Sequence, residues 1–407
     1  MGDQTAIAAL ADVSANAAFA AGEHDPDADW SLPGWLYTDP EYHAVEVERV
    51  IRPSWQIVCH VSDIPKAGDW RTIDYIGESV IVVRGEDRQV RAFVNVCRHR
   101  AMRLVEGSAG CAKKLVCPYH AWVYETDGRL TGVPMKADYP ALKLEDNGLA
   151  PVAIEVWHGF VFVCLKPGTF PTVGEMMAPH EAEIAPYRFE DMRVISDMRL
   201  RPRSVNWKNV GDNYSDNLHI PVAHDGLVRI FGKSYEIGAD DWVDRLKGDL
   251  VDKPSAHFWE RFYQTHLPRA EHLPEDSQRR WLYYKLWPNT AFDVYADQID
   301  FMQWLPISPT TCLLREMAYA LPDANLPLQE RRTMKLVRYA NWRINRVVNK
   351  EDTWLIERVQ QGMASDSYGA GPIGRSEVCL RSFARKIRAL TPEARLHKAP
   401  PAGWSKA

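Results

Sequence analysis

Two cysteines and two histidines stand in two short pairs whose spacing is typical of a metal site. The sequence reads Cys97-Arg-His99, then 17 residues, then Cys117-Pro-Tyr-His120. Each pair brings two ligands onto one loop, and two such loops can clamp one centre between them. Zinc fingers usually place two cysteines in one pair and two histidines in the other. The mixed pairing favours a [2Fe–2S] cluster in which one iron takes both thiolates and the other both imidazoles. Zinc and purely structural roles are the alternatives.

A second concentration of acids and imidazoles lies between Asn206 and His224. If this stretch is helical, Asp216 and His219 stand three residues apart and share one face. Pro221 cannot continue the helix, and that break frees His224 to swing toward the same point. Two neutral imidazoles can bind a divalent metal, and iron(II) sites with open positions complete two histidines with one carboxylate. Surface positions for both histidines are the alternative.

The carboxylate is expected from a helix between about Leu328 and Gln361. Asp352 falls in the apolar stripe of this helix, where a carboxylate is costly unless it is paired or binds a metal. A hydrogen bond to a core partner is the alternative, and Glu351 is expected to point away as ordinary surface. The stripe recurs every three or four residues, at Val337, Ala340, Ile344, Val348, Leu355 and Val359.

The elements that hold these residues differ between the two halves of the chain. Residues 55–165 contain short strand-like runs, such as 79–83 and 90–96, and turns such as Asp127-Gly128, which predict a small antiparallel β domain. Runs at 281–287 and 299–305 predict a second sheet, whereas 238–280 resembles a long polar excursion. With the helix after Leu328, the predicted fold class is α+β.

The composition is that of a globular protein that acts on small molecules. A length of 407 residues predicts roughly two domains, and a net charge of −5 offers no basic surface for nucleic acid or an anionic membrane. Seven thinly spread cysteines favour a reducing compartment over a disulfide framework. No run approaches 18 apolar residues, and residues 1–22 lack the regions of a signal peptide, so a cytoplasmic protein is expected.

The segment from Cys97 to His120, followed by Trp122, resembles the Rieske motif. High-potential Rieske proteins of respiratory complexes carry an extra, bridged cysteine in each cluster loop. This chain has Ala101 in the first loop and no cysteine between Cys117 and His120, so it resembles the oxygenase or ferredoxin branch, with a lower potential. Together with the second constellation, the chain resembles the Rieske non-haem iron oxygenases, also called ring-hydroxylating oxygenase α subunits.

The resemblance implies two sets of ligands. Cys97, His99, Cys117 and His120 would hold the [2Fe–2S] cluster, and His219, His224 and Asp352 would hold a mononuclear Fe(II). It also implies four segments: residues 1–50 packing on the catalytic domain, a Rieske domain at 51–167, a catalytic domain at 168–390 and an irregular tail at 391–407. The catalytic domain would have a helix-grip antiparallel sheet with one long helix.

Asp216 would be an electron-transfer bridge in the resemblance. In the family this carboxylate links an iron-ligand histidine to a Rieske histidine of the neighbouring subunit, here His120, which implies a homotrimer. Asn213 would lie near the iron. The family often has Glu-Asn where this chain has Asp212-Asn213, and Tyr where it has Leu218. Both departures can alter the groups that orient the ligands.

The implied function is that of a terminal oxygenase component. It would take electrons that originate in NAD(P)H from a flavin or iron–sulfur reductase, with or without a ferredoxin, and use O2 to hydroxylate a small, aromatic substrate. Oxidative N- or O-demethylation of a betaine-like or methoxylated substrate is the alternative, and an iron-free electron carrier with a ligand-binding domain is a third. A small β subunit occurs in some members of the family.

Overall fold

The computed structural model describes residues 25–406, which form two compact units. One unit is Arg52–Gly174, and the other joins the residues before it to those after it. The stretch 1–22, for which the sequence predicts no signal peptide, lies outside the described residues. In the described part of the chain, no helix is both long and apolar enough to cross a membrane.

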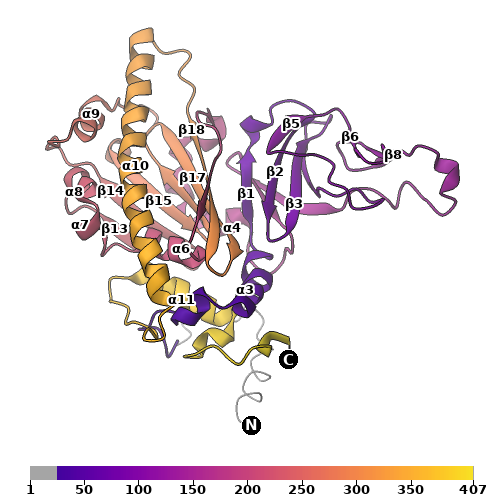
Figure 1. Ribbon diagram of the computed structural model, residues 1–407. Coiled ribbons are helices and arrows are strands. Elements are labelled where there is room, and N and C mark those ends of the chain that lie inside the picture. Colours follow the sequence, from indigo (N-terminus) through magenta and orange to yellow (C-terminus); the bar gives the residue numbers. More distant parts are fainter. Residues whose placement is uncertain (1–24, 407) are drawn as a thin grey trace. The chain divides into compact units, whose positions relative to one another are not determined.

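The unit Arg52–Gly174 is built from antiparallel strands (Figure 1). Seven strands form one sheet in the order β1-β10-β9-β4-β3-β2-β5, and three short strands form another in the order β6-β7-β8. The strands are β1 (Gln56–His60), β2 (Asp69–Tyr75), β3 (Glu78–Arg84), β4 (Val90–Val94), β5 (Ala109–Cys111), β6 (Leu115–Val116), β7 (Val123–Tyr124), β8 (Leu130–Gly132), β9 (Pro151–Trp157) and β10 (Phe160–Cys164). The predicted antiparallel sheet is therefore present.

Turn chemistry fixes two of these strand pairings. Ile76 and Gly77 join β2 to β3 with φ angles of 45° and 79°, the two positive values that a type I′ hairpin needs. Gly128 lies in the predicted turn between β7 and β8 with φ 90°. A Cβ atom on Gly128 would lie 2.4 Å from Cε1 of Phe93. Glycine therefore satisfies both the backbone angle and the close approach of the ring.

The second unit contains an eight-stranded antiparallel sheet in the order β11-β18-β17-β16-β15-β14-β13, with β12 also paired to β18. The strands are β11 (Arg193–Val194), β12 (Arg199–Arg203), β13 (Glu236–Ala239), β14 (Val243–Asp249), β15 (Arg280–Leu286), β16 (Thr290–Val294), β17 (Gln298–Ser308) and β18 (Thr311–Ala320). The predicted α+β class is confirmed by this sheet and by the helices that cover it.

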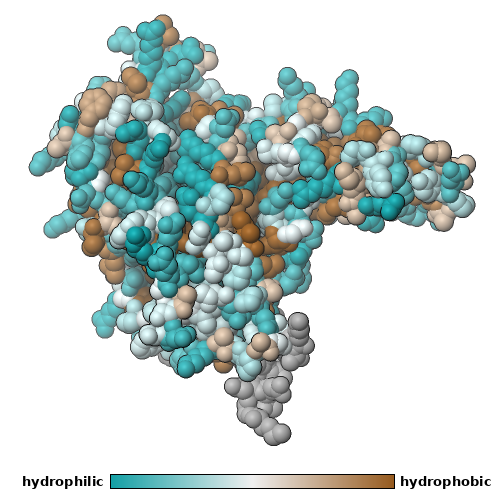
Figure 2. Space-filling view, viewed as in Figure 1, coloured by the Kyte–Doolittle hydropathy of each residue, from teal (hydrophilic) through white to brown (hydrophobic). Residues whose placement is uncertain are grey.

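The long helix α10 (Leu328–Met363) crosses one face of this sheet (Figure 1). Its buried positions recur at helical spacing, as the sequence predicts; they are Met334, Val337, Ala340, Asn341, Ile344, Ile356 and Gln360. Its outer face is largely hydrophilic (Figure 2). The predicted stripe is wrong at its end: Val359 is 45% exposed, and Ile356 and Gln360 are buried instead. Over ten turns a period of 3.6 residues drifts away from any short repeat read from the sequence.

The remaining α-helices are shorter, and most lie around the sheet. They are α3 (Pro40–Glu46), α4 (Val173–Met177), α5 (Glu181–Ile184), α6 (Trp207–Ser215), α7 (Ile220–Ala223), α8 (Asp225–Phe231), α9 (Phe258–His266) and α11 (Val378–Leu390). The predicted excursion at 238–280 is wrong in part, because β14 and the end of β13 lie inside it and belong to the sheet. The burial of β14 alternates along the strand, but its charged residues hide that pattern in the sequence.

Residues from both ends of the chain hold α6 in place. Lys208 of α6 forms an ion pair of 2.7 Å with Glu46 of α3, and neither side chain is more than 1% exposed. The hydroxyl of Tyr37 donates a hydrogen bond of 2.8 Å to Asp212 of α6. Burial raises the pKa of Asp212 to about 6. The hydrogen bond from Tyr37 opposes that rise, because it stabilises the ionised carboxylate. The Trp35 indole donates to the carbonyl of Leu396 at 2.8 Å. Beyond Leu390 the chain forms only two short 3-10 turns, η9 (Pro392–Arg395) and η10 (Trp404–Lys406).

Candidate metal centres and an adjoining cavity

The two loops of the unit Arg52–Gly174 that carry the Cys–His pairs have the same backbone hydrogen bonds. The Cys97 amide donates to Met102 O at 2.8 Å, and the Ala101 amide donates to Cys97 O at 3.1 Å. In the second loop the Cys117 amide donates to Trp122 O at 2.8 Å, and the Ala121 amide donates to Cys117 O at 3.0 Å. Ala101 and Ala121 both adopt positive φ, at 56° and 53°. Each loop is therefore the same tight turn, which points its Cys and His side chains in one direction.

The four side chains separate into a sulfur pair and a nitrogen pair. The Cys97 and Cys117 thiols are buried, each 2% exposed, whereas His99 and His120 are half-buried with their Nδ1 atoms 3.1 Å apart. Burial raises the pKa of the Cys97 thiol, although the Tyr124 hydroxyl, 3.3 Å from its Sγ, lowers it. Trp122 stacks on the His99 ring with centroids 4.9 Å apart. This division fits a cluster with one iron on thiolates and the other on imidazoles.

A single zinc ion fits these four donors less well. Tetrahedral zinc at bond lengths of about 2.0–2.3 Å needs donors roughly 3.3–3.8 Å apart. Among the described residues, His219, His224 and Asp352 are the one His/Cys/Asp/Glu group whose ligand atoms all lie within 4.8 Å of one another. No three of the Cys–His donors gather that closely, so the geometry favours the two-iron cluster.

The helix that carries Asp216 ends earlier than predicted. α6 stops at Ser215, and Asp216 is its C-cap with extended backbone. The Asp216 carboxylate then accepts hydrogen bonds from the amides of Leu218 at 2.8 Å and His219 at 3.2 Å, as an N-cap residue does. Pro221 lies in the first turn of α7, where a missing N–H is harmless, rather than ending a helix. Asp216 and His219 thus meet through capping, not by sharing a helix face.

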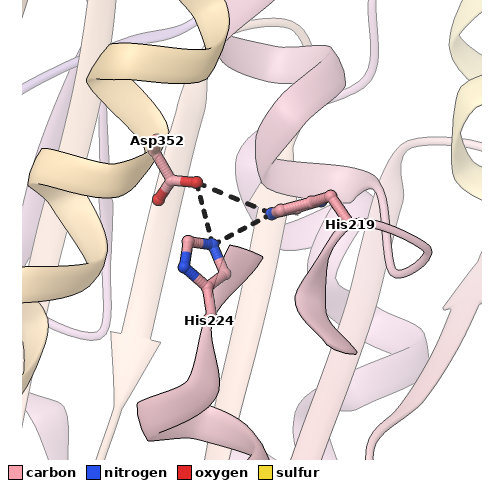
Figure 3. Close-up of side chains that lie close together, drawn as sticks. All are labelled: His219, His224 and Asp352. Carbon is pink, nitrogen blue, oxygen red and sulfur yellow. Dashed lines mark hydrogen bonds and ion pairs between the residues drawn. The ribbon is translucent and has the colours of Figure 1, made fainter. Parts of the chain in front are cut away.

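His219, His224 and Asp352 converge on one point (Figure 3). The two Nε2 atoms are 3.1 Å apart, and Oδ1 of Asp352 lies 3.0 Å from Nε2 of His224 and 3.5 Å from Nε2 of His219. Ligands at right angles and about 2.1 Å from a metal lie roughly 3.0 Å apart. The three atoms therefore fit one face of an octahedral ion and leave the opposite positions open.

Each histidine is oriented by a carboxylate on its other ring nitrogen. Nδ1 of His219 lies 2.8 Å from Oδ2 of Asp216, and Nδ1 of His224 lies 2.7 Å from Oε2 of Glu351. A carboxylate only accepts, so each Nδ1 carries the proton and each Nε2 presents its lone pair to the shared point. The prediction that Glu351 is ordinary surface is wrong. Residues 351 and 352 lie about 100° apart on a helix, and the longer Glu351 side chain reaches the far side of the same ring.

The charges around this point suit a cation. Burial raises the pKa of Asp352, but hydrogen bonds from His219, His224 and Asn213 lower it to about 2. The Asn213 amide donates to Oδ1 of Asp352 at 2.8 Å. Burial lowers the pKa of His219, while hydrogen bonds to Asp216 and Asp352 raise it to about 9. The Asp352 carboxylate is therefore ionised at neutral pH, the state that binds a metal, and a bound metal would displace the proton that the raised pKa of His219 keeps on Nε2.

A cavity of about 130 Å³ adjoins the three candidate ligands and is lined by α6, α7, α8, α10 and the sheet. Asp293 of β16 and Asp300 of β17 line it from directly opposite positions of the two strands. The Tyr214 hydroxyl donates to Oδ1 of Asp293 at 2.6 Å. Burial raises the pKa of Asp293 to about 7, and burial together with Asp293 raises that of Asp300. Aromatic side chains complete the wall: Tyr214, Tyr235, Tyr283, Phe301 and Trp342.

Comparisons with known proteins match both units. The family described as "Ring hydroxylating alpha subunit (catalytic domain)" matches residues 189–393, and "Rieske [2Fe-2S] domain" matches residues 54–145. The carnitine monooxygenase oxygenase subunit of Escherichia coli (strain K12) is 29% identical over 359 residues, 86% of this chain and 88% of that protein. The glycine betaine monooxygenase oxygenase subunit of Chromohalobacter salexigens is 35% identical over 235 residues, 57% of this chain and 51% of that protein.

Solved structures show the same fold. A quaternary ammonium Rieske monooxygenase in complex with L-carnitine has a TM-score of 0.72 at 24% identity, with 92% of this chain and 100% of that chain covered. Naphthalene 1,2-dioxygenase from Rhodococcus sp., bound to indole, has a TM-score of 0.73 at 20% identity, with 93% and 98% covered. The fold is thus common to proteins with different named substrates, so the cavity must distinguish them.

Proposed function

Since this chain belongs to the Rieske non-haem iron oxygenases, we propose that it oxidises a C–H bond on a carbon attached to the nitrogen of a quaternary ammonium substrate. The family prediction is confirmed, and with it a terminal oxygenase component with a [2Fe–2S] cluster, a mononuclear iron and a reductase partner. The relatives favour the oxidative-demethylase alternative over the aromatic hydroxylation first expected.

The buried carboxylates of the cavity carry this proposal. Asp293 and Asp300 face each other across neighbouring strands, and Glu316 of β18 lines the same cavity. Glu316 is already paired with Arg201 at 3.0 Å. A neutral hydrocarbon, however, would offer Asp293 and Asp300 no counter-charge, and a buried carboxylate is costly unless it is paired. A quaternary ammonium would offset their charge and place its methyl groups against the aromatic walls. The substrates named for the relatives, carnitine, glycine betaine and choline, all contain this group.

We assign the cofactors to the two constellations described above. Cys97, His99, Cys117 and His120 would hold the cluster, and His219, His224 and Asp352 would hold the iron. When bound, the cluster supplies electrons and the iron activates O2. One oxygen atom of O2 would enter the C–H bond, and the other would leave as water with two electrons from the reductase and two protons. The C–N bond of the hydroxylated carbon would then break, releasing an aldehyde, a tertiary amine that keeps the electron pair, and the hydroxyl proton.

The protein's own part is to orient ligands and substrate. Asp216 and Glu351 keep the protons of His219 and His224 on Nδ1. Asn213 holds Oδ1 of Asp352 by donating a hydrogen bond. Tyr214, which donates to Asp293, fixes the carboxylate that would face the ammonium. The aromatic walls would keep water away from the reacting C–H bond.

We also propose that Asp216 is the electron-transfer bridge in a homotrimer, linking His219 to His120 of a neighbouring copy. Leu218 and Val222, which follow Asp216 in the chain, are 49% and 84% exposed, as expected if another copy covers them. A cytoplasmic location is a further proposal, supported by seven free cysteines. Native mass spectrometry tests the trimer, and it also tests for a small β subunit.

Turnover of the reconstituted enzyme tests the function. The protein is purified without oxygen, supplied with NADH and a flavin–iron–sulfur reductase, and offered betaines or naphthalene and benzoate. The proposal requires aldehyde formation from a betaine, coupled to O2 consumption, and its loss in Asp352→Ala. Formation of a dihydrodiol from an aromatic substrate, with no aldehyde from any quaternary ammonium compound, would overturn it.

A further inference from the structure

Two arginines flank one tryptophan on the wall of the cavity. The guanidinium of Arg199 on β12 lies 5.8 Å from the ring centroid of Trp342, and that of Arg346 lies 5.2 Å from it. All three side chains line the cavity that adjoins the iron ligands. A guanidinium held against an aromatic ring keeps a fixed plane and leaves its N–H donors free.

These arginines differ from two paired arginines of the same unit. Arg338 pairs with Asp297 at 2.7 Å, and Arg201, also on the cavity wall, pairs with Glu316 at 3.0 Å. Within residues 25–406, the side chains of Arg199 and Arg346 form neither a hydrogen bond nor an ion pair. Unused donors of two adjacent cations, facing a cavity, are suited to bind an anion.

Arg199 lies apart from Asp293, although Arg199 stands opposite Glu316 of β18. Arg199 is on β12 and Asp293 on β16, with β18 and β17 between them, a backbone separation of about 14 Å across the sheet. The cavity therefore carries Asp293 on β16 and two guanidinium groups beside Trp342. Arg199 also lowers the pKa values of Asp300 and Glu316, which burial raises. A ligand that joins a cation to an anion through a short chain would complement both the Asp293 carboxyl group and the two guanidinium groups.

We propose that Arg199 and Arg346 form a carboxylate-binding subsite, so that the substrate is a quaternary ammonium carboxylate rather than a simple ammonium alcohol. This inference rests on the proposed function and narrows it. Each guanidinium would donate hydrogen bonds to the carboxylate, with Trp342 holding the two groups in place. The subsite would hold the substrate in one orientation, with its ammonium end toward Asp293 and the iron ligands.

The test compares an acid with its uncharged ester. The substrates are 4-(trimethylammonio)butanoate and its methyl ester, which share the ammonium group and differ in the anion. The variants are Arg346→Gln and Arg199→Gln, and Arg343→Gln is the matched control, since it is exposed on the same helix outside the cavity. Iron content and circular dichroism establish that each variant is folded and loaded.

The proposal predicts that KM for the acid rises roughly 10- to 100-fold in Arg346→Gln, the expected effect of losing a charge-assisted hydrogen bond. KM for the ester and kcat for both should change less than twofold, and Arg343→Gln should behave as wild type. Equal effects on acid and ester, or no effect on either, would overturn the subsite.

Calorimetric binding of both compounds to the holoenzyme separates this inference from the proposed function. If neither compound is oxidised but the acid binds and loses affinity in Arg346→Gln, the proposed function fails and the subsite stands. If wild type oxidises both and binds them equally, the proposed function stands and the subsite fails.

Discussion

The two metal-binding units bring their ligands together in different ways. In the unit Arg52–Gly174, two copies of one tight turn present all four donors, and the two histidines are 21 positions apart. In the catalytic unit, His224 and Asp352 are 128 positions apart and meet only because α10 packs across the sheet. Local backbone geometry positions the first set, and tertiary packing positions the second.

The largest expected effect is the selective loss of one metal centre. Cys117→Ser should abolish the cluster and its reduced-state EPR signal but leave the mononuclear iron site able to bind metal, because its ligands lie in another compact unit. Asp352→Ala should remove the mononuclear iron and retain the cluster. Both variants should lose turnover. Iron and acid-labile sulfide analysis measures each outcome, and loss of both metals from either variant would contradict the independence of the two units.

Asp216→Ala should interrupt electron transfer between the two metal centres while both units keep their metals. Since we propose that Asp216 carries electrons toward His219, cluster oxidation during a single turnover should slow by a factor on the order of 100 or more, a size comparable to losses seen when the groups that orient a reaction are removed. Stopped-flow absorbance of the reduced cluster measures this rate. A wild-type rate with full metal content would contradict the bridge.

Glu351→Gln should weaken metal binding in the catalytic unit without affecting the cluster. An amide can present its N–H to the Nδ1 of His224 or accept only weakly, so the ring loses its fixed orientation. The expected loss in iron affinity is about 10- to 100-fold, measured by competition with a chelator. Glu330→Gln, exposed in the first turn of the same helix, is the control. Equal affinities in the two variants would make the Glu351 contact incidental.

The smallest expected effect is on the pH dependence of substrate binding. Burial raises the pKa of Asp293 to about 7, so this carboxyl is mostly neutral at pH 6 and mostly ionised at pH 8. A quaternary ammonium keeps its charge throughout, and KM should therefore fall by up to about tenfold between these pH values. Asp300, Glu316, Tyr214 and Tyr283 also face this part of the cavity.

Asp293→Asn tests the assignment of that pH dependence. The variant should show a higher KM and a flatter profile, because an amide does not titrate. An unchanged profile would assign the effect to Asp300 or Glu316, whose pKa values burial also raises. The pH profile of KM for a neutral substrate analogue gives the pH dependence of the iron site alone, which can then be subtracted.

The difference between the units also explains what the sequence could predict. The four Cys–His side chains could be grouped from the sequence because short spacings within one loop are visible there, and the positive φ at Ala101 and Ala121 needs no distant contact. Asp352 was identifiable because a carboxylate interrupts an apolar stripe. Glu351 was not, since only the path of α10 relative to His224 determines which of two adjacent acids reaches the ring.

The cavity lay further beyond sequence reasoning. Asp293, Asp300 and Arg199 sit on three strands whose register brings them to one face, and nothing in their local sequence distinguishes them from surface residues. Strand pairing across the sheet, not periodicity along one strand, places them together. The predicted domain limits at residues 50, 167 and 390 remain predictions.

The length of α10 has a consequence for how related enzymes diverge. Asp352, a proposed iron ligand, and Arg346, in the proposed subsite, are both carried by this helix. Six residues of helix put about 9 Å of axis between them. A continuous helix keeps this separation fixed, so in the proposed subsite it would determine which distance between the ammonium group and the carboxylate of a substrate is accepted. Moving the arginine to another cavity-lining position of this helix, such as Asn349, would change the accepted length by about 4–5 Å, without replacing a proposed metal ligand.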